Sequence, residues 1–338
     1  MRKPMDRNLA FELVRVTEAA ALAAARWMGR GSRESADQAA VDAMRFALRS
    51  VGMDGIVVIG EGEKDEAPML YNGETVGNGT PPLVDVAVDP VDGTTLLAKG
   101  LPNAISAIAI AERGALFNPK NIFYMDKIAV GPEARGAIDI NLSVAENLHR
   151  IAEAKRYRVE DLTVVVLDRD RHNKLIGEIR EAGARIKMIS HGDIAGGLMP
   201  ALPDTGMDVL MGVGGAPEAV ITACALKCLG GEIQCKLWPR NDEDVRLAEA
   251  RGLDVKAVLK TTDLADGDDT FFAATGVTDG ELLKGVRYTS DGAWTQSLAM
   301  RARSGTVRTM DSHHHFSKLM RISALAYQNG KKEKSDQK

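Results

Sequence analysis

The sequence predicts a mixed α/β protein built from two packed subdomains. At 338 residues the chain is too long for one ordinary small core. Short β-branched runs alternate with amphipathic segments. Residues 162–189 read as a strand–helix–strand unit, which is typical of an α/β sheet. A composition shift before this unit places a boundary near residue 160. The predicted divisions are 1–160, 161–328 and a disordered charged tail, 329–338.

The overall charge argues against a nucleic-acid-binding protein. Lys and Arg together number 43 and Asp and Glu 47, which leaves a net charge of -4. That balance offers no basic surface for a phosphate backbone. Charged residues interrupt the apolar N-terminal segment, and no signal-peptide core or run of about 20 apolar residues is present. We expect a soluble, cytoplasmic protein without a membrane partner.

The three cysteines suit a reducing compartment, because three thiols cannot form a disulfide framework. Cys224 and Cys228 lie one helical turn apart in an apolar segment, but two thiols without a nearby histidine make a poor zinc site. We expect these two cysteines and Cys235 to be buried structural residues.

The chain begins with two predicted helices, 8–28 and 35–50. Leu13, Val16 and Ala20 recur on one face of the first, and a Gly-Arg-Gly break ends it. Asp37 falls in the first turn of the second helix. It could be a carboxylate stabilised by the helix dipole or a functional residue, and the pattern favours neither.

Two predicted strands each end in a carboxylate-rich turn. The run 55–60 leads into Glu61-Gly62-Glu63-Lys64-Asp65, and the run 84–88 leads into Asp89-Pro90-Val91-Asp92-Gly93-Thr94. Residues 72–82 read as an exposed loop between them. Pro90 is expected to end the strand ladder, and Gly93 permits close backbone approach to an anion.

Each turn alone has an ordinary interpretation, as a solvated acidic loop or an Asp-Pro turn. Their repetition favours a functional site, since adjacent strands would bring the carboxylates together. Carboxylate oxygens are the ligands that hard divalent cations prefer. Thr94 would begin the next helix, where backbone N–H groups favour an anion.

The second half contributes a basic turn and a glycine-rich helix start. Arg169 and Arg171 follow the strand 162–167, at the strand end where α/β sheets bind ligands. They could hold a phosphate or form a solvated turn with neighbouring aspartates, and these are equally supported. Glu218 follows Gly214-Gly215-Ala216-Pro217 at a helix start, available as a further metal ligand. The segment is no G-x-G-x-x-G fingerprint.

The remaining elements are predicted from periodicity alone. His313-His314-His315 is interpreted as polar surface, because three consecutive side chains cannot converge on one ion. The other predicted strands are 103–111, 184–189, 208–213 and 271–276, and the other predicted helices are 143–157, 173–182, 219–229 and 241–257.

Three motifs, in this order, resemble class II fructose-1,6-bisphosphatase: Ile59-Gly60-Glu61-Gly62-Glu63, Asp89-Pro90-x-Asp92-Gly93-Thr94 and Gly214-Gly215-Ala216-Pro217-Glu218. That family belongs to the lithium-sensitive, metal-dependent sugar and inositol phosphatases. The resemblance extends from about residue 8 to about residue 320. It implies a layered α-β-α-β-α sandwich and hydrolysis of the 1-phosphate of fructose 1,6-bisphosphate in gluconeogenesis. It also implies a homo-oligomer, either a dimer or a tetramer.

The resemblance further implies roles for individual residues, with two or three Mg²⁺ or Mn²⁺ ions as cofactors. The implied metal ligands are Asp37, Glu61, Asp89, Asp92 and Glu218. The residues implied to orient the attacking water are Thr94, Asp65 and Glu61. The implied substrate-binding residues are Arg33, Asp92, Gly93, Thr94, Tyr124, Arg169, Asp170, Arg171, His191, Gly192, Asp193 and Gly215.

Two positions differ from the usual family pattern. His191 precedes Gly192-Asp193 where the family usually has Asp-Gly-Asp, and Arg33 replaces a common lysine. A histidine can still bind a sugar hydroxyl, but its charge depends on pH. Sedoheptulose 1,7-bisphosphate and inositol phosphates are therefore alternative substrates. A catalytically silent phosphosugar-binding regulator is the alternative outside the enzyme class.

Overall fold

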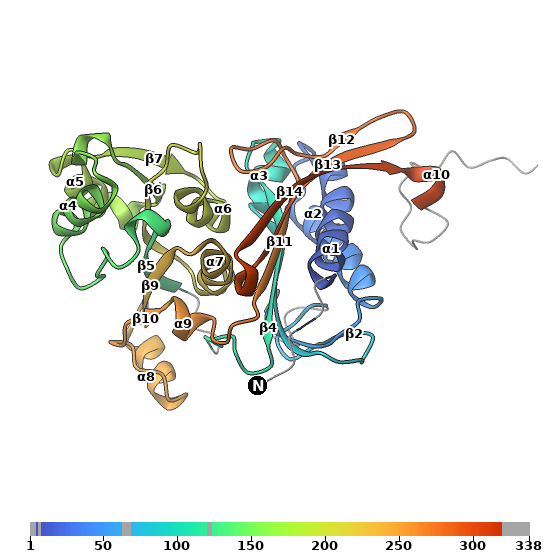
Figure 1. Ribbon diagram of the computed structural model, residues 1–338, viewed down its shortest axis with the longest axis horizontal. Coiled ribbons are helices and arrows are strands. Elements are labelled where there is room, and N and C mark those ends of the chain that lie inside the picture. The colour runs from blue at the N-terminus through green and yellow to red at the C-terminus, as the bar shows by residue number, and fades with distance from the viewer. Residues whose placement is uncertain (1–4, 6–7, 63–68, 120–123, 320–338) are drawn as a thin grey trace, which may run out of the picture.

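Helices and sheets alternate in five layers in the part of the chain that the computed structural model describes, residues 5, 8–62, 69–119 and 124–319 (Figure 1). The order is α-β-α-β-α, which confirms the predicted fold class. The larger sheet lies between the N-terminal helices and a central helical layer, and the smaller sheet lies on the other side of that layer.

The larger sheet contains both predicted acidic turns. β1 pairs with β3 in parallel, so both strands end at the same edge. Its other pairings are antiparallel. The strands in spatial order are β12 (Arg287–Tyr288), β13 (Gly292–Arg301), β11 (Phe271–Gly276), β4 (Ile105–Glu112), β3 (Leu83–Asp92), β1 (Asp54–Ile59) and β2 (Thr75–Gly77), with β14 (Thr306–His315) pairing along β13.

The smaller sheet is mixed. β6 pairs in parallel with β7 and β8, as the predicted strand–helix–strand unit requires. Its strands in spatial order are β10 (Leu259–Lys260), β9 (Glu232–Leu237), β5 (Tyr124–Val130), β8 (Val209–Gly215), β6 (Thr163–Leu167) and β7 (Arg185–Ile189).

Helix α7 (Ala216–Leu229) is the centre of the middle layer. It contacts strands of both sheets, and its side chains are buried almost all round, as expected for a helix between two apolar surfaces. α6 (Asp193–Leu198) packs beside it. The outer helices are α1 (Leu9–Ala24) and α2 (Arg33–Leu48) on the larger sheet, and α4 (Val144–Lys155) and α5 (Asn173–Glu181) on the smaller one. The shorter helices are α3 (Thr94–Lys99), α8 (Asp242–Ala250), α9 (Thr261–Leu264) and α10 (Phe316–Leu319).

The cysteines are buried and free, which confirms their structural interpretation. Burial raises the pKa of Cys224 and of Cys235 to about 12, so both stay as thiols. Among the described residues, no helix is long and apolar enough to span a membrane.

Several predicted boundaries need correction. The boundary near residue 160 does not separate the sheets, because β5 precedes it and belongs to the smaller sheet, whereas β11 and β13 return to the larger one. The predicted loop 72–82 contains β2, which pairs with β1. The predicted helix 241–257 is only α8, since the chain turns at Gly252 with φ +73°.

Pro90 does not end its strand, contrary to the prediction. β3 continues to Asp92, and its register with β4 shifts between Asp89 and Asp92. A bulge tolerates a proline because the residue it adds does not need a ladder hydrogen bond.

A buried ion pair joins the loop before β11 to the end of β13. Arg301 donates from Nε and Nη2 to the two carboxylate oxygens of Asp269, at 2.8 and 2.9 Å. The Met5 amide also donates to Asp269, whose side chain is 1% exposed. Through the Met5 amide, the pair therefore holds the N-terminal segment against the larger sheet.

We expect Asp269→Asn to destabilise the protein by about 3–5 kcal/mol, because it leaves the Arg301 charge buried without its counter-charge. The matched control is Asp161→Asn, whose partner Arg158 is 78% exposed; that change should cost less than about 1 kcal/mol. Urea unfolding measures both. Equal losses in the two variants would contradict the assignment.

Candidate active site

A cavity of about 720 Å³ opens where elements of the two sheets and the middle helices meet. This volume is in the range of small-ligand pockets. Its lining brings together residues that are up to 185 positions apart, from Arg33 to Glu218. It contains Arg33, Asp37, Glu61, Asp89, Asp92, Gly93, Thr94, Tyr124, Arg169, Arg171, His191, Gly192, Asp193, Gly215 and Glu218.

Parallel pairing of β1 with β3 places the first two carboxylates beside each other. Glu61 follows the end of β1, and Asp89 lies in β3 just after the paired residues. The bulge that accommodates Pro90 then carries the chain to Asp92, which also lines the cavity. The prediction that adjacent strands bring these turns together is confirmed.

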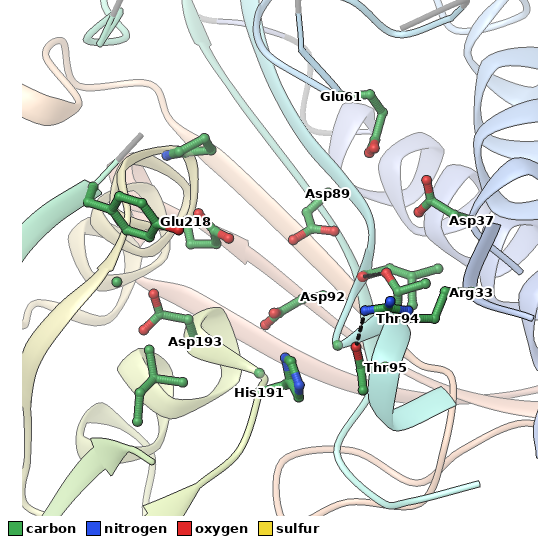
Figure 2. Close-up of a pocket in the computed structure, with 18 of the residues that line it drawn as sticks. Arg33, Asp37, Glu61, Asp89, Asp92, Thr94, Thr95, His191, Asp193 and Glu218 are labelled. Atoms are coloured by element: carbon green, nitrogen blue, oxygen red, sulfur yellow. Dashed lines mark hydrogen bonds between the residues drawn. The ribbon is translucent and has the colours of Figure 1, made fainter. Parts of the chain in front are cut away.

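Two helix starts supply the remaining carboxylates. Asp37 comes from the first half of α2, and Glu218 from the first turn of α7, where Pro217 suits the helix start. Figure 2 shows Asp89 and Asp92 between Asp37 and Glu61 on one side and Glu218 on the other.

Burial and mutual repulsion raise the pKa values of this group. Burial raises the pKa of Glu61 to about 8, and Asp37 and Glu218 add to it. Burial also raises the pKa of Asp92 to about 7, with further contributions from Glu218 and Asp193. Asp89 is raised well above its ordinary value by burial, then by Asp92 and the other three carboxylates. The group has the chemistry of a site for divalent cations, which would relieve this repulsion.

The carboxylates do not close around a single point. Among the described residues, no three of them have oxygens that all lie within 4.8 Å of one another.

A sharp corner follows Asp92. Gly93 has φ +93°, a conformation that a side chain would strain, and Thr94 begins α3. The Thr94 hydroxyl donates to the Val91 carbonyl at 3.1 Å, which leaves its lone pairs available as acceptors. On the opposite side, the amides of Ile194 and Ala195 donate to Asp92 Oδ2 at 3.0 and 3.4 Å.

Basic and aromatic side chains form the part of the cavity wall that belongs to the smaller sheet. Arg171 donates from Nη2 to the Val213 carbonyl at 2.8 Å, and its guanidinium lies 5.3 Å from the centre of the Tyr124 ring. Arg169 donates to the Asp168 carbonyl at 2.7 Å. Arg171 is thus anchored to β8, while Arg169 bonds within its own turn.

The turn before α6 provides polar groups between these two regions. Gly192 has φ +89°, and His191 precedes it. Burial, followed by Arg169, Lys99 and Arg33, lowers the pKa of His191, so its imidazole is neutral at neutral pH. Asp193 is 6% exposed, and its Oδ1 has no hydrogen-bond partner among the described residues.

Two residues behind the wall were missed by sequence reasoning. Lys127 is 2% exposed; it donates to Asp193 Oδ2 and, at 3.2 Å, to the Gly215 carbonyl. Its sequence signal was weak, because Asp126 and Lys127 together look like an exposed charged pair that interrupts an apolar run. His172 Nε2 accepts from the Val213 amide at 2.8 Å, and its Nδ1 lies 2.6 Å from the Leu167 carbonyl. This histidine holds the arginine turn against β8.

Two predicted site residues are not placed in the cavity. Asp170 is exposed and does not line it. Asp65 lies outside the described residues.

Comparison with known proteins assigns the family. The family model described as bacterial fructose-1,6-bisphosphatase, glpX-encoded, matches residues 7–314. The chain is 44% identical to the class 2 fructose-1,6-bisphosphatase of Haemophilus influenzae, with 94% of this chain and 99% of that protein covered. It is 43% identical to fructose-1,6-bisphosphatase 1 class 2 of Escherichia coli K12, with 92% and 96% covered. These similarities extend over nearly the whole chain and contain all three motifs, and the chain therefore belongs to the glpX-encoded family of bacterial fructose-1,6-bisphosphatases.

Proposed function

We propose that this protein hydrolyses the 1-phosphate of fructose 1,6-bisphosphate to fructose 6-phosphate and phosphate, with divalent cations bound in the cavity. Family membership supports the reaction. The main supporting observation is the cavity itself, whose lining combines a carboxylate cluster, a Gly-Thr corner and a pair of arginines. One end suits a phosphate that reacts, and the other suits a phosphate that is only bound.

The carboxylates of Asp37, Glu61, Asp89, Asp92 and Glu218 would hold Mg²⁺ or Mn²⁺, two or three ions in all. Their oxygens are hard ligands, and their raised pKa values mean that positive charge is favourable there. Bound divalent cations would neutralise the phosphate charge and lower the pKa of a water molecule.

Thr94 and Glu61 are proposed to orient the attacking water. Because the Thr94 hydroxyl already donates to Val91, it can accept a hydrogen bond from water and direct a lone pair toward phosphorus. Glu61, which lines the cavity, is the carboxylate proposed to take the proton that the water loses. Asp65 is an alternative for that role by resemblance. The backbone at Asp92-Gly93-Thr94 would receive the 1-phosphate.

Arg169, Arg171 and Tyr124 are proposed to bind the distant phosphate. Guanidinium groups bind phosphate with two parallel hydrogen bonds, and the fixed Arg171 loses little freedom on binding. Such remote binding energy would favour a bisphosphate over a monophosphate. Gly215 would contact substrate nearby, whereas Arg33, whose Nη1 donates to Thr95 Oγ1 at 3.4 Å, would contact it at the Thr94 corner (Figure 2).

The segment His191-Gly192-Asp193 is proposed to bind the sugar. The unpartnered Asp193 Oδ1 can accept a hydrogen bond from a sugar hydroxyl, and the neutral His191 can donate or accept one. Lys127 would position Asp193 through the buried ion pair. Asp170, exposed outside the cavity, would act only through its neighbours.

We also propose that the protein is cytoplasmic and acts as a homo-oligomer, a dimer or tetramer. Its free buried thiols suit a reducing compartment. The oligomeric state follows from the family resemblance, and sedimentation equilibrium measures it directly.

The direct test is phosphate release from fructose 1,6-bisphosphate in Mg²⁺ or Mn²⁺. We expect a chelator to abolish release and Thr94→Ala to lower kcat by about 10²–10⁴-fold with little change in KM, since the lost interaction orients the nucleophile. Thr80→Ala, an exposed threonine on the loop before β3, is the matched control. Full activity without metal, or wild-type kcat in Thr94→Ala, would reject the proposal.

Arg171→Ala should lower kcat/KM for fructose 1,6-bisphosphate by about 30-fold, the equivalent of ~2 kcal/mol for a lost charge-assisted hydrogen bond. Its kcat/KM for fructose 1-phosphate, which lacks the second phosphate, should stay the same. Arg180→Ala, an exposed arginine on α5, serves as the control. An equal loss on both substrates would show that Arg171 does not bind the distant phosphate.

Metal affinity should depend on pH, because metal binding must displace protons from carboxyls whose pKa values are raised. Asp92, with a pKa of about 7, and Glu61, with a pKa of about 8, are increasingly protonated as pH falls. We therefore expect Mg²⁺ affinity to fall below pH 8 by about tenfold per pH unit for each displaced proton. Calorimetry in buffers of different ionisation enthalpy counts the protons released. An affinity that is flat between pH 6 and 8 would contradict the assignment.

A further inference from the structure

The C-terminal end of β14, together with the turn before β13, carries a second group of metal-ligand side chains, which do not line the catalytic cavity. The ligand atoms of Asp291, His313 and His315 all lie within 4.8 Å of one another, and all three residues are exposed. We propose that they form a surface site for a transition-metal ion of the Zn²⁺ or Ni²⁺ type, separate from the carboxylate cluster.

The strand geometry explains why these residues converge. Side chains alternate along a strand, so His313 and His315 share one face of β14 while His314 points to the other. His315 is paired across the ladder with Gly292, and this places it next to Asp291 in the turn before β13. The interpretation of the three histidines as plain polar surface is thus incomplete, because alternate ones can share an ion with a residue from the partner strand.

His314 does not take part. It lies between the sheet and α1, where its Nε2 is 2.8 Å from Thr295 Oγ1 and 3.7 Å from Glu18 Oε1. Burial, followed by the proximity of His313, lowers its pKa, with Glu18 opposing. It therefore anchors β14 to α1 and keeps the other two imidazoles on the outer face.

Neighbouring groups orient each proposed ligand. His313 stacks on Trp294 with ring centres 4.5 Å apart and an angle of 13° between the planes. Thr289 Oγ1 donates to Asp291 Oδ1 at 3.0 Å, and the other carboxylate oxygen lies 3.5 Å from His315 Nδ1. The Thr289 hydrogen bond lowers the pKa of Asp291, and its carboxylate is charged at neutral pH. Such supporting contacts are typical of metal ligands.

The donor set selects a different ion from the catalytic one. Two imidazoles and one carboxylate suit Zn²⁺, Ni²⁺ or Cu²⁺, whereas Mg²⁺ prefers oxygen ligands. Ligands of a tetrahedral zinc ion, at about 2.0–2.1 Å from it, lie about 3.4 Å apart. Exposed side chains within 4.8 Å of one another can reach that spacing by small rotations. A bound ion would link the 289–292 turn to the end of β14.

The experiment uses the full-length protein without an affinity tag, with excess Mg²⁺ present to occupy the oxygen-rich cavity. Zn²⁺ is added in a calorimetric titration, and Ni²⁺ in a parallel titration followed by quenching of tryptophan fluorescence, since Trp294 stacks on His313. We expect His313→Ala/His315→Ala to lose one equivalent of Zn²⁺ and the saturable part of the quenching. The control variant His149→Ala, at an exposed residue of α4, should keep both the Zn²⁺ equivalent and the quenching.

Two further measurements keep the result interpretable. The double variant should retain wild-type phosphatase activity in Mg²⁺ and an unchanged circular dichroism spectrum. Loss of Zn²⁺ binding in this variant can then be separated from any loss of the proposed catalytic function. Asp291→Asn, which leaves both imidazoles in place, should weaken Zn²⁺ binding at least tenfold. Unchanged Zn²⁺ stoichiometry in the double variant, or an equal loss in His149→Ala, would overturn the proposal.

Discussion

Parallel pairing of β1 with β3 is the constraint on which the candidate active site depends. Because both strands run the same way, Glu61 and Asp89 lie at the same edge of the sheet. Antiparallel pairing would send the two acidic turns to opposite ends of the strands. α2 then brings Asp37 to this edge and α7 brings Glu218, so the carboxylate group depends on tertiary packing rather than on any one segment.

Burying these carboxylates close together costs free energy unless positive charge compensates for their repulsion. Buried carboxylates that repel one another have raised pKa values, and the protein tolerates this because backbone amides and one lysine partly offset it. The Ile194 and Ala195 amides donate to Asp92, and Lys127 pairs with Asp193 beside Glu218. These contacts keep the carboxylates in place for cations instead of letting them separate into solvent.

Much of the fold could be predicted because apolar periodicity and turn residues agree with it. The strands around both acidic turns and the helix after Gly215 were found from sequence. The family resemblance named five of the carboxylates that line the cavity as metal ligands, but not Glu34. β5 was missed because Asp126 and Lys127 interrupt its apolar pattern; their partners come from other segments. β14 was missed because an edge strand with one open face carries polar residues along much of its length.

The remaining errors have similar physical causes. Pro90 normally ends a ladder, and only the register of β4 shows that a bulge accommodates it. The metal-ligand group at Asp291 could not be foreseen from three adjacent histidines, since it needs the cross-strand register of β13 and β14. In each case the missing information is a pairing between residues far apart in sequence.

The cavity lies between regions supplied by the two sheets, and the way these regions are joined determines its shape. The larger sheet supplies Glu61, Asp89, Asp92 and the Thr94 corner, and the smaller one supplies Tyr124 and the arginine turn. The helices α2 and α7 add Asp37 and Glu218. The spacing between these regions is set where α6 joins them, because its first amides bond to Asp92. Asp193, at the start of that helix, is held by Lys127 of β5. The distance between the two regions of the cavity is therefore fixed by buried hydrogen bonds at α6, and any ligand that spans the cavity must match that distance.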